Sequence, residues 1–111
     1  MQPISFCITA AKNEKNYVLG LLDSLVDNTE FEKHEVLILI DSDNQNQFEA
    51  FLEYRKDKPN IKVYKNEDDR IGYQRNISIL FSHATNDVVV YLQADMVAGN
   101  KFDYYFLEAL N

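Results

Sequence analysis

With 111 residues, 46% of them hydrophobic and 26% charged, the chain is long enough for one globular domain with a modest core. Its formal net charge of −7 argues against broad binding to nucleic acids or to anionic membranes. No apolar run approaches the length of a transmembrane helix, and residues 1–4 lack the basic and apolar regions of a signal peptide. We therefore expect a cytoplasmic protein without an integral membrane segment.

Apolar patterns along the chain alternate between strand and helix spacing. The predicted strands are the apolar or alternating runs at residues 4–9, 35–40, 61–64 and 88–92. The predicted helices, whose apolar residues recur on one face, lie at about residues 15–27, 46–55, 77–84 and 102–110. We expect the run 88–92, Val-Val-Val-Tyr-Leu, to be the central strand and to be buried on both faces.

An order of strand, helix, strand, helix predicts parallel strands joined by right-handed crossovers, with helices on both faces. The expected fold class is therefore α/β, as a three-layer α/β/α arrangement of the Rossmann-like kind. Few glycines and prolines interrupt the chain, and no stretch has the composition of a linker, so residues 1–111 form one continuous unit or one piece of a larger domain.

The loops after the four predicted strands meet at one edge of such a sheet, which is where open α/β sheets bind ligands. Asp95 follows the run 88–92, and a carboxylate there can bind a divalent cation; the alternative is that it only caps the loop. Arg75 lies near a predicted helix start, where acidic residues are favoured over basic ones. Either its guanidinium binds a phosphate through two hydrogen bonds, or it is an ordinary surface residue. The polar residues of these loops are Lys12, Asn13, Glu14, Asp41, Ser42, Asp43, Asn66, Arg70, Arg75, Asn76, Gln93 and Asp95.

Several other kinds of site are absent from the sequence. Glycines at positions 20, 72 and 99 cannot form a dinucleotide-binding fingerprint, and there is no P-loop. His34 and His83 are isolated and have no zinc-binding spacing, so surface or helix-end positions are expected for them. Cys7, the single cysteine, lies in an apolar run and is expected to be a buried, unreactive thiol.

Five short segments follow one another in an informative order. They are Ile8–Glu14 (ITAAKNE), Ser24-Leu25, Ile40–Asp43 (IDSD), the set Asn66, Gly72, Arg75 and Asn76, and Leu92–Asp95 (LQAD). Together they resemble the inverting family-2 glycosyltransferases, which have the A-type nucleotide-sugar-binding fold. The resemblance implies a nucleotide-diphospho-sugar transferase-like fold in which residues 1–111 are the donor-binding half, and a transferase that uses a nucleotide-diphospho-sugar donor.

The resemblance also implies roles for the matching residues. The residues expected to bind the donor are Thr9, Ala10, Asn13, Glu14, Asp41, Arg75 and Gln93. Asp41 would accept a hydrogen bond from the base, and Arg75 would lie near the diphosphate. Asp95 would coordinate Mn²⁺ or Mg²⁺, which neutralises the charge that develops on the diphosphate as the sugar departs.

The sequence departs from the family pattern in three respects, the first of which is that Asp41-Ser42-Asp43 lacks the second adjacent acid and the glycine usual there. Gln93 stands where the family has the first acid of its Asp-x-Asp motif, and an amide adds no charge for a metal. The family's acceptor-binding half has no counterpart in residues 1–111, so the catalytic base is expected beyond Asn111, where the glycan, lipid or protein acceptor would also bind. The aromatic-rich final helix would then leave apolar surface uncovered, which predicts self-association as a homo-oligomer.

Two other functions compete with a transferase. A phosphoacceptor receiver domain needs a pair of acids directly after its first strand, and Thr9-Ala10-Ala11 provides none. A non-catalytic nucleotide-binding or interaction module of the same fold stays open because of Gln93 and the missing acceptor half.

Overall fold

The computed structural model describes residues 1–66 and 72–110 of the chain. Its strands are β1 (Ile4–Ala10), β2 (Glu35–Ile40), β3 (Ile61–Lys65) and β4 (Val88–Leu92). Its helices are α1 (Lys15–Asn28), α2 (Gln45–Tyr54), α3 (Tyr73–His83) and α4 (Phe102–Ala109), with short 3₁₀ turns at η1 (Phe31–Lys33) and η2 (Arg55–Asp57). The predicted alternation is therefore confirmed. Within these residues no helix is both long and apolar enough to cross a membrane.

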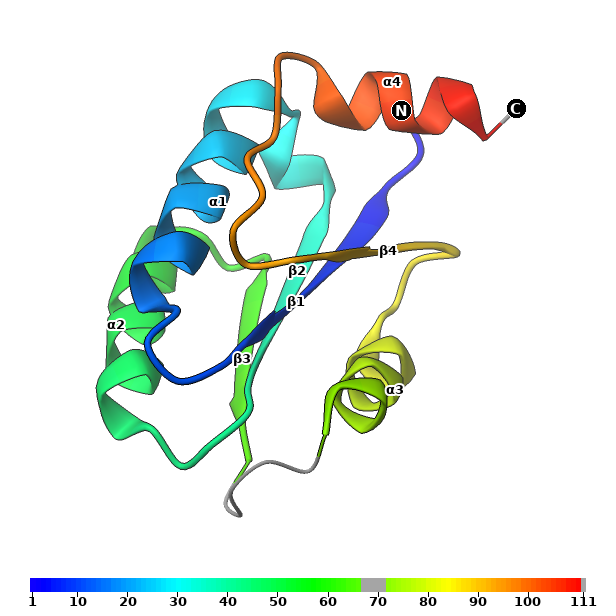
Figure 1. Ribbon diagram of the computed structural model, residues 1–111. Helices are drawn as coiled ribbons and strands as arrows, with labels where there is room; N and C mark the ends of the chain where they lie inside the picture. Colours follow the sequence, from blue (N-terminus) through cyan, green and yellow to red (C-terminus); the bar gives the residue numbers. More distant parts are fainter. Residues whose placement is uncertain (67–71, 111) are drawn as a thin grey trace.

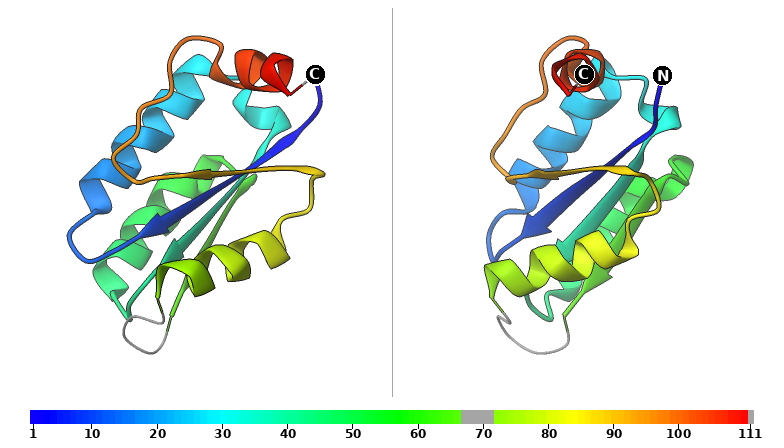
Figure 2. Two further views of the ribbon diagram at one scale, coloured as in Figure 1. Left: turned by 45° about the vertical axis from the view of Figure 1, so that its right-hand side comes forward. Right: turned by 90° about the vertical axis from the view of Figure 1, so that its right-hand side faces the viewer.

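The four strands are all parallel and lie in the order β3-β2-β1-β4. Helices α1 and α2 cover one face of the sheet and α3 covers the other, which confirms the three-layer prediction (Figures 1 and 2). Helix α4 lies at the end of the sheet where β1 begins (Figure 1). The carboxyl ends of the strands consequently point away from α4, toward the loops expected to form the site.

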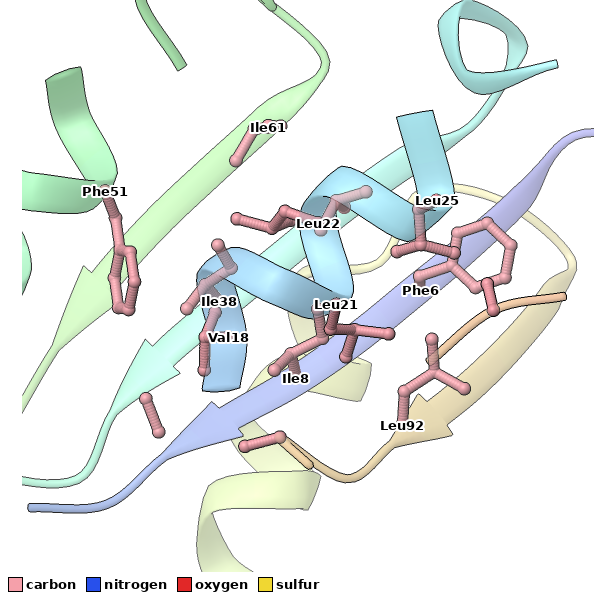
Figure 3. Packing of buried hydrophobic residues seen from close by; sticks show 14 of the residues in the cluster. Phe6, Ile8, Val18, Leu21, Leu22, Leu25, Ile38, Phe51, Ile61 and Leu92 are labelled. Atoms are coloured by element: carbon pink, nitrogen blue, oxygen red, sulfur yellow. The ribbon is translucent and has the colours of Figure 1, made fainter. Parts of the chain in front are cut away.

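Two apolar clusters hold the layers together. The larger cluster packs α1 and α2 on the sheet, and its fully buried members include Phe6, Ile8, Leu22 and Ile38 (Figure 3). The smaller cluster joins α3 to the opposite face and consists of Cys7, Leu37, Leu39 and Leu80. Cys7 is fully buried, and burial, helped by the charge of Glu35, raises the pKa of its thiol to about 12. The predicted burial of Cys7 is confirmed, and a raised thiol pKa favours the unreactive, protonated form.

Three sequence-based expectations need correction, two about β4 and one about α3. In the described part of the sheet β4 pairs only with β1, so it is an edge strand rather than the central one. Val90 and Leu92 on one face are buried, while Val89 and Tyr91 on the other face are only half-buried, so the run is not fully buried on both faces. Phe81 is one of the apolar residues whose spacing places it on the inner face of the helix predicted at 77–84, but it is 44% exposed, because α3 contacts the sheet through Leu80.

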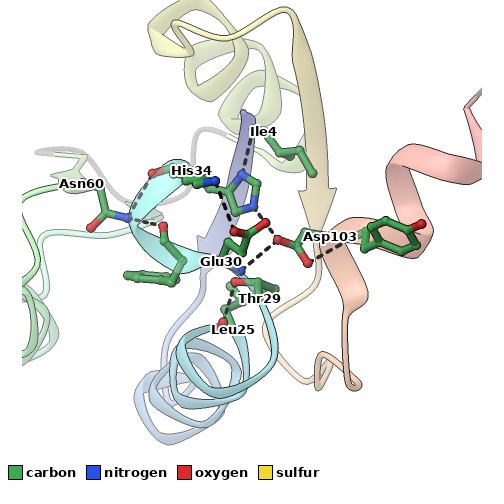
Figure 4. Close-up of polar contacts among 10 residues, drawn as sticks. Ile4, Leu25, Thr29, Glu30, His34, Asn60 and Asp103 are labelled. Carbon is green, nitrogen blue, oxygen red and sulfur yellow. Dashed lines mark hydrogen bonds and ion pairs between the residues drawn. The ribbon is translucent and has the colours of Figure 1, made fainter. Parts of the chain in front are cut away.

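His34 is buried at the end of the 3₁₀ turn η1, so of the two expected positions the helix end is confirmed and the surface is wrong. Its Nδ1 accepts a hydrogen bond from Ile4 N–H at 3.0 Å, so the ring proton lies on Nε2 and is donated to Asp103 Oδ2 at 2.7 Å (Figure 4). Burial alone would raise the pKa of Asp103, but hydrogen bonds from His34 and from the N–H groups of Glu30 and Tyr104 lower it below its ordinary value. This network ties α4 to the starts of β1 and β2.

A second buried acid, Glu35, lies at the start of β2. Its carboxylate accepts hydrogen bonds from Ser5 Oγ at 2.7 Å, from Thr85 N and Oγ1 at 2.9 Å each, and from Lys62 Nζ at 2.6 Å. Burial alone would raise the pKa of Glu35, but these four donors outweigh it and lower the pKa from 4.5 to about 2.

The depressed pKa of Glu35 predicts a pH-dependent contribution to stability. Because the folded pKa lies below the unfolded one, the contribution is complete above about pH 4.5 and is lost as the pH falls through about 2. We expect Glu35→Gln to lower the free energy of unfolding by about 2–3 kcal/mol near neutral pH, and the difference from wild type to shrink toward pH 2. Urea denaturation across this range measures it, with the exposed Glu32→Gln as control. A difference that stays constant with pH would contradict it.

Candidate active site

A cleft of about 480 Å³ lies at the carboxyl edge of the sheet. Its walls come from β1 and β4, from the loops that follow β1, β2 and β4, and from the start of α3. The residues that line it are Thr9, Ala11, Glu14, Asp41, Gly72, Asn76, Tyr91, Gln93, Ala94 and Asp95. The predicted convergence of the strand-end loops is therefore seen at this edge.

Asn66 links two polar residues on one side of the cleft. Its Nδ2 donates to Asp41 Oδ1 and to Asn76 Oδ1, each at 3.1 Å, so both hydrogens of the amide are directed to acceptors. Asn76 is 1% exposed, and its Oδ1 is turned toward Asn66. This arrangement fixes the orientation of the Asp41 carboxylate and the Asn76 amide, which both line the cleft.

Thr9 and Tyr91 meet beneath the cleft, from neighbouring strands. Thr9 Oγ1 lies 2.8 Å from the Tyr91 hydroxyl, close enough for either to donate. β1 and β4 pair so that Cys7 is opposite Tyr91, which places the Tyr91 side chain on the same face of the sheet as Thr9. Both residues line the cleft, so their hydroxyl groups add to the acids and amides that the strand-end loops contribute to it.

The loop after β1 is held by its own backbone and by α2. Ala11 N–H donates to Glu14 Oε1 at 2.7 Å, Glu14 N–H donates to Ala11 O at 3.2 Å, and Gln47 Nε2 donates to Ala11 O at 3.0 Å. Asn13 has a φ of 70°, a left-handed conformation that asparagine tolerates better than most residues. The Glu14 carboxylate therefore stabilises the loop as well as lining the cleft.

The start of α3 forms the remaining wall through Gly72. This residue precedes the helix with a φ of 98°, a conformation that side chains rarely adopt, although a Cβ would meet no atom within 4 Å. Its carbonyl accepts the first helical hydrogen bond, from Asn76 N–H at 3.0 Å. The glycine thus lets the chain turn into α3 beside the cleft.

A model of the Glycosyl transferase family 2 matches residues 6–111. The chain belongs to glycosyl transferase family 2. The match covers most of β1, the other three strands of this family-2 domain and all residues that line the cleft. No curated protein sequence matches the chain closely enough to count as a relative.

Solved structures share the fold of this family-2 domain. Residues 1–349 of S. aureus TarS superpose with a TM-score of 0.77 at 23% identity, over 98% of this chain and 32% of that one. The same protein in complex with UDP-GlcNAc gives a TM-score of 0.78 at 23% identity, over 98% and 30%. The mannosyltransferase PcManGT from Pyrobaculum calidifontis, in complex with GDP-Man and Mn²⁺, gives 0.73 at 19% identity, over 88% and 29%. The expected nucleotide-diphospho-sugar transferase-like fold is confirmed, and the family-2 domain spans only 29–32% of the length of these chains.

The charges in the cleft of the family-2 domain bear on whether a metal fits. Three lining residues are acidic, Glu14, Asp41 and Asp95, and none of the described lining residues is basic. Residues 1–66 and 72–110 contain no cluster of three His, Cys, Asp or Glu side chains that could hold a metal ion. The side chains of the cleft therefore do not provide enough ligands to hold a metal ion by themselves. A single carboxylate such as Asp95 would fit only an ion that takes most of its ligands from a bound molecule and water, as magnesium ions commonly do.

The predicted donor-binding residues are distributed unevenly around the cleft of the family-2 domain. Thr9, Glu14, Asp41 and Gln93 line it. Ala10 is fully buried in the core, and Asn13 lines a separate pocket of about 280 Å³ with Lys15, Asn16, Asn44, Asn46 and Gln47. Arg75 is exposed in the first turn of α3 and does not line the cleft.

Two sequence-based expectations fall on parts of the family-2 domain that the structure does not describe. Arg70, one of the polar loop residues, lies outside the described residues. Asn111, beyond which the catalytic base is expected, also lies outside them. The position of the base therefore stays a prediction.

Sequence patterns missed Tyr91 and Gly72 as parts of the site of this family-2 domain. In the sequence, Tyr91 looks like one more apolar residue of the strand at 88–92. The alternation of a strand does place Tyr91 and Leu92 on opposite faces of the sheet, but it does not show that the face of Tyr91 borders a cleft. Gly72 carried a usable signal, because a glycine directly before a helical stripe often adopts a positive φ.

Proposed function

We propose that this family-2 domain binds a nucleotide-diphospho-sugar and presents it for transfer of the sugar to a glycan, lipid or protein acceptor. The observation that carries the proposal is the cleft itself, where an oriented acid, Asp41, and an exposed acid, Asp95, lie at the ends of different strands. Membership of the family favours a transferase over a non-catalytic module of the same fold. The buried free thiol of Cys7 is compatible with the reducing, cytoplasmic setting that we also propose.

In the proposed complex, the base of the nucleotide lies beside Asp41 and Asn76. The Asp41 carboxylate, which Asn66 holds in place, would accept a hydrogen bond from an N–H of the base. The buried amide of Asn76 lies next to this carboxylate. Thr9 and Tyr91 lie beneath the nucleotide, and Gln93 is placed to bind a ribose hydroxyl. Asp95 would then face the diphosphate.

A divalent ion, Mn²⁺ or Mg²⁺, is the second proposed component. When bound between Asp95 and the diphosphate, it would supply positive charge against the charge that develops as the sugar departs. The proposal is supported by the acidic lining of the cleft, because a diphosphate beside Glu14, Asp41 and Asp95 is otherwise repelled. The Mn²⁺ in the mannosyltransferase complex is consistent with it.

Removing the Asp41 carboxylate tests the donor site. We expect Asp41→Ala to weaken binding of UDP or GDP by about 1–3 kcal/mol, because a hydrogen-bonding group of the base loses its partner. Isothermal titration calorimetry measures the two dissociation constants. Asp43→Ala is the matched control, because Asp43 is exposed, pairs with Lys65 and does not line the cleft. Equal affinities for wild type and Asp41→Ala would remove Asp41 from the site.

A further inference from the structure

The segment that carries Asp95, residues 93–101, leaves β4 and runs beside α1 before α4 begins (Figures 1 and 2). Its first residues form a turn, in which Met96 N–H donates to Gln93 O at 3.1 Å and Gln93 N–H approaches Met96 Sδ at 3.3 Å. Asp95 is exposed within this turn, whereas Ala94 and Ala98 on either side are each 4% exposed. The two buried alanines fix the ends of the short stretch that carries the carboxylate.

Ala98 is held on α1 by two side chains, one turn of helix apart. Ala98 N–H donates to Ser24 Oγ at 2.8 Å, and the Ser24 hydroxyl in turn donates to Leu21 O at 2.7 Å. Asn28 Nδ2 donates to Ala98 O at 3.0 Å. Ser24 is only 8% exposed, so its hydroxyl bonds to Ala98 and Leu21 rather than to solvent. Both backbone polar groups of Ala98 are therefore bound by α1.

We propose that Ser24 and Asn28 are positioning residues, which hold the turn of Asp95 at the place where its carboxylate and a diphosphate can share one ion. The inference rests on the proposed function of Asp95. On one side of Asp95 the backbone is fixed by the pairing of Leu92 with Ile8, and on the other by Ala98. Because both ends are held, the turn is already ordered before the ligand binds. The binding free energy is therefore not reduced by the entropy cost of ordering the turn.

The proposal also accounts for an otherwise unusual choice of residues. Serine in a helix interior competes with the helix by binding its own backbone, and Ser24 does so through Leu21 O. Ser82 on α3 makes the same kind of bond, to Ile79 O at 2.6 Å, but it is exposed, and no contact to the segment 93–101 is described for it. Ser82 is therefore a matched control for the local effect of losing a helix hydroxyl.

The test compares Ser24→Ala, Asn28→Ala, Ser24→Thr and Ser82→Ala with wild type. Calorimetry gives the affinity for UDP and for GDP with and without Mn²⁺, and the ratio of the two affinities measures the coupling between metal and nucleotide. We expect Ser24→Ala and Asn28→Ala each to reduce this ratio about five-fold, the usual effect of one hydrogen bond, with the metal-free affinity unchanged. Ser24→Thr, which keeps the hydroxyl, and Ser82→Ala should leave the ratio as in wild type.

A second measurement does not depend on nucleotide binding. Amide hydrogen exchange should become faster at Ala98 and also at Met96 in Ser24→Ala, while amides of β2 stay as in wild type. Unchanged coupling in Ser24→Ala, an equal loss of metal-free and metal-dependent affinity, or unchanged exchange at Met96 would each overturn the inference. If wild type binds neither nucleotide, the proposed function fails, and exchange at Met96 alone decides whether Ser24 orders the turn.

Discussion

Mn²⁺ together with UDP or GDP should raise the melting temperature of the wild-type chain by far more than either component alone. One carboxylate is a weak site for a divalent ion, and an acidic cleft repels a diphosphate, so each ligand needs the other. At about 100 times the dissociation constant, a ligand that binds only the folded chain stabilises it by about 2.7 kcal/mol. For a domain of this size the shift is on the order of 10 °C. Differential scanning calorimetry measures it.

The Asp95→Asn variant should lose this joint shift and keep the small shifts of the separate ligands. The substitution preserves the shape of the side chain and removes its charge, and Asp95 is exposed, so little packing changes. Asp87→Asn is a suitable control, because Asp87 is an exposed acid beside the opposite end of β4. A shift in Asp95→Asn equal to that of wild type, or no dependence on Mn²⁺, would leave Asp95 as a residue that only caps the loop.

Asp103→Ala should lower the free energy of unfolding by about 3 kcal/mol. The substitution leaves the His34 Nε2–H and the Glu30 N–H without the acceptor that both use, and the His34–Asp103 pair is buried. Because the network joins α4 to β1 and β2, we expect α4 to detach before the sheet unfolds (Figure 4). Urea denaturation, followed by circular dichroism, measures the loss.

The control for Asp103→Ala is Glu108→Ala, which removes an exposed acid from the same helix. Asp103→Asn should fall between the two, because its amide oxygen can still accept from His34 while the charge is lost. Equal stability of Asp103→Ala and Glu108→Ala would show that the buried network contributes nothing measurable. Since α4 follows directly on the segment 93–101, the same variant tests whether anchoring of α4 affects the site.

The position of the site was accessible from sequence because it follows from strand direction alone. Once residues 4–9, 35–40 and 88–92 are recognised as parallel strands, their ends must share one edge, and Asp41 and Asp95 must meet there. The central position assigned to β4 was wrong because its valine-rich run resembles that of a strand covered on both faces. Half-burial of Val88 and Tyr91 depends on which strand lies alongside, and sequence periodicity carries no information about that neighbour.

The order of strands and helices in this protein was determined by its sequence, because apolar periods of two and of about 3.6 residues act within a few neighbours along the chain. The tertiary structure alone decided which polar groups meet. His34 binds Asp103 across 69 residues, Ser24 binds Ala98 across 74, and Asn66 binds Asp41 across 25. Such partners are chosen by strand order and helix packing, which bring distant segments within about 3 Å of one another, and no local pattern specifies that choice.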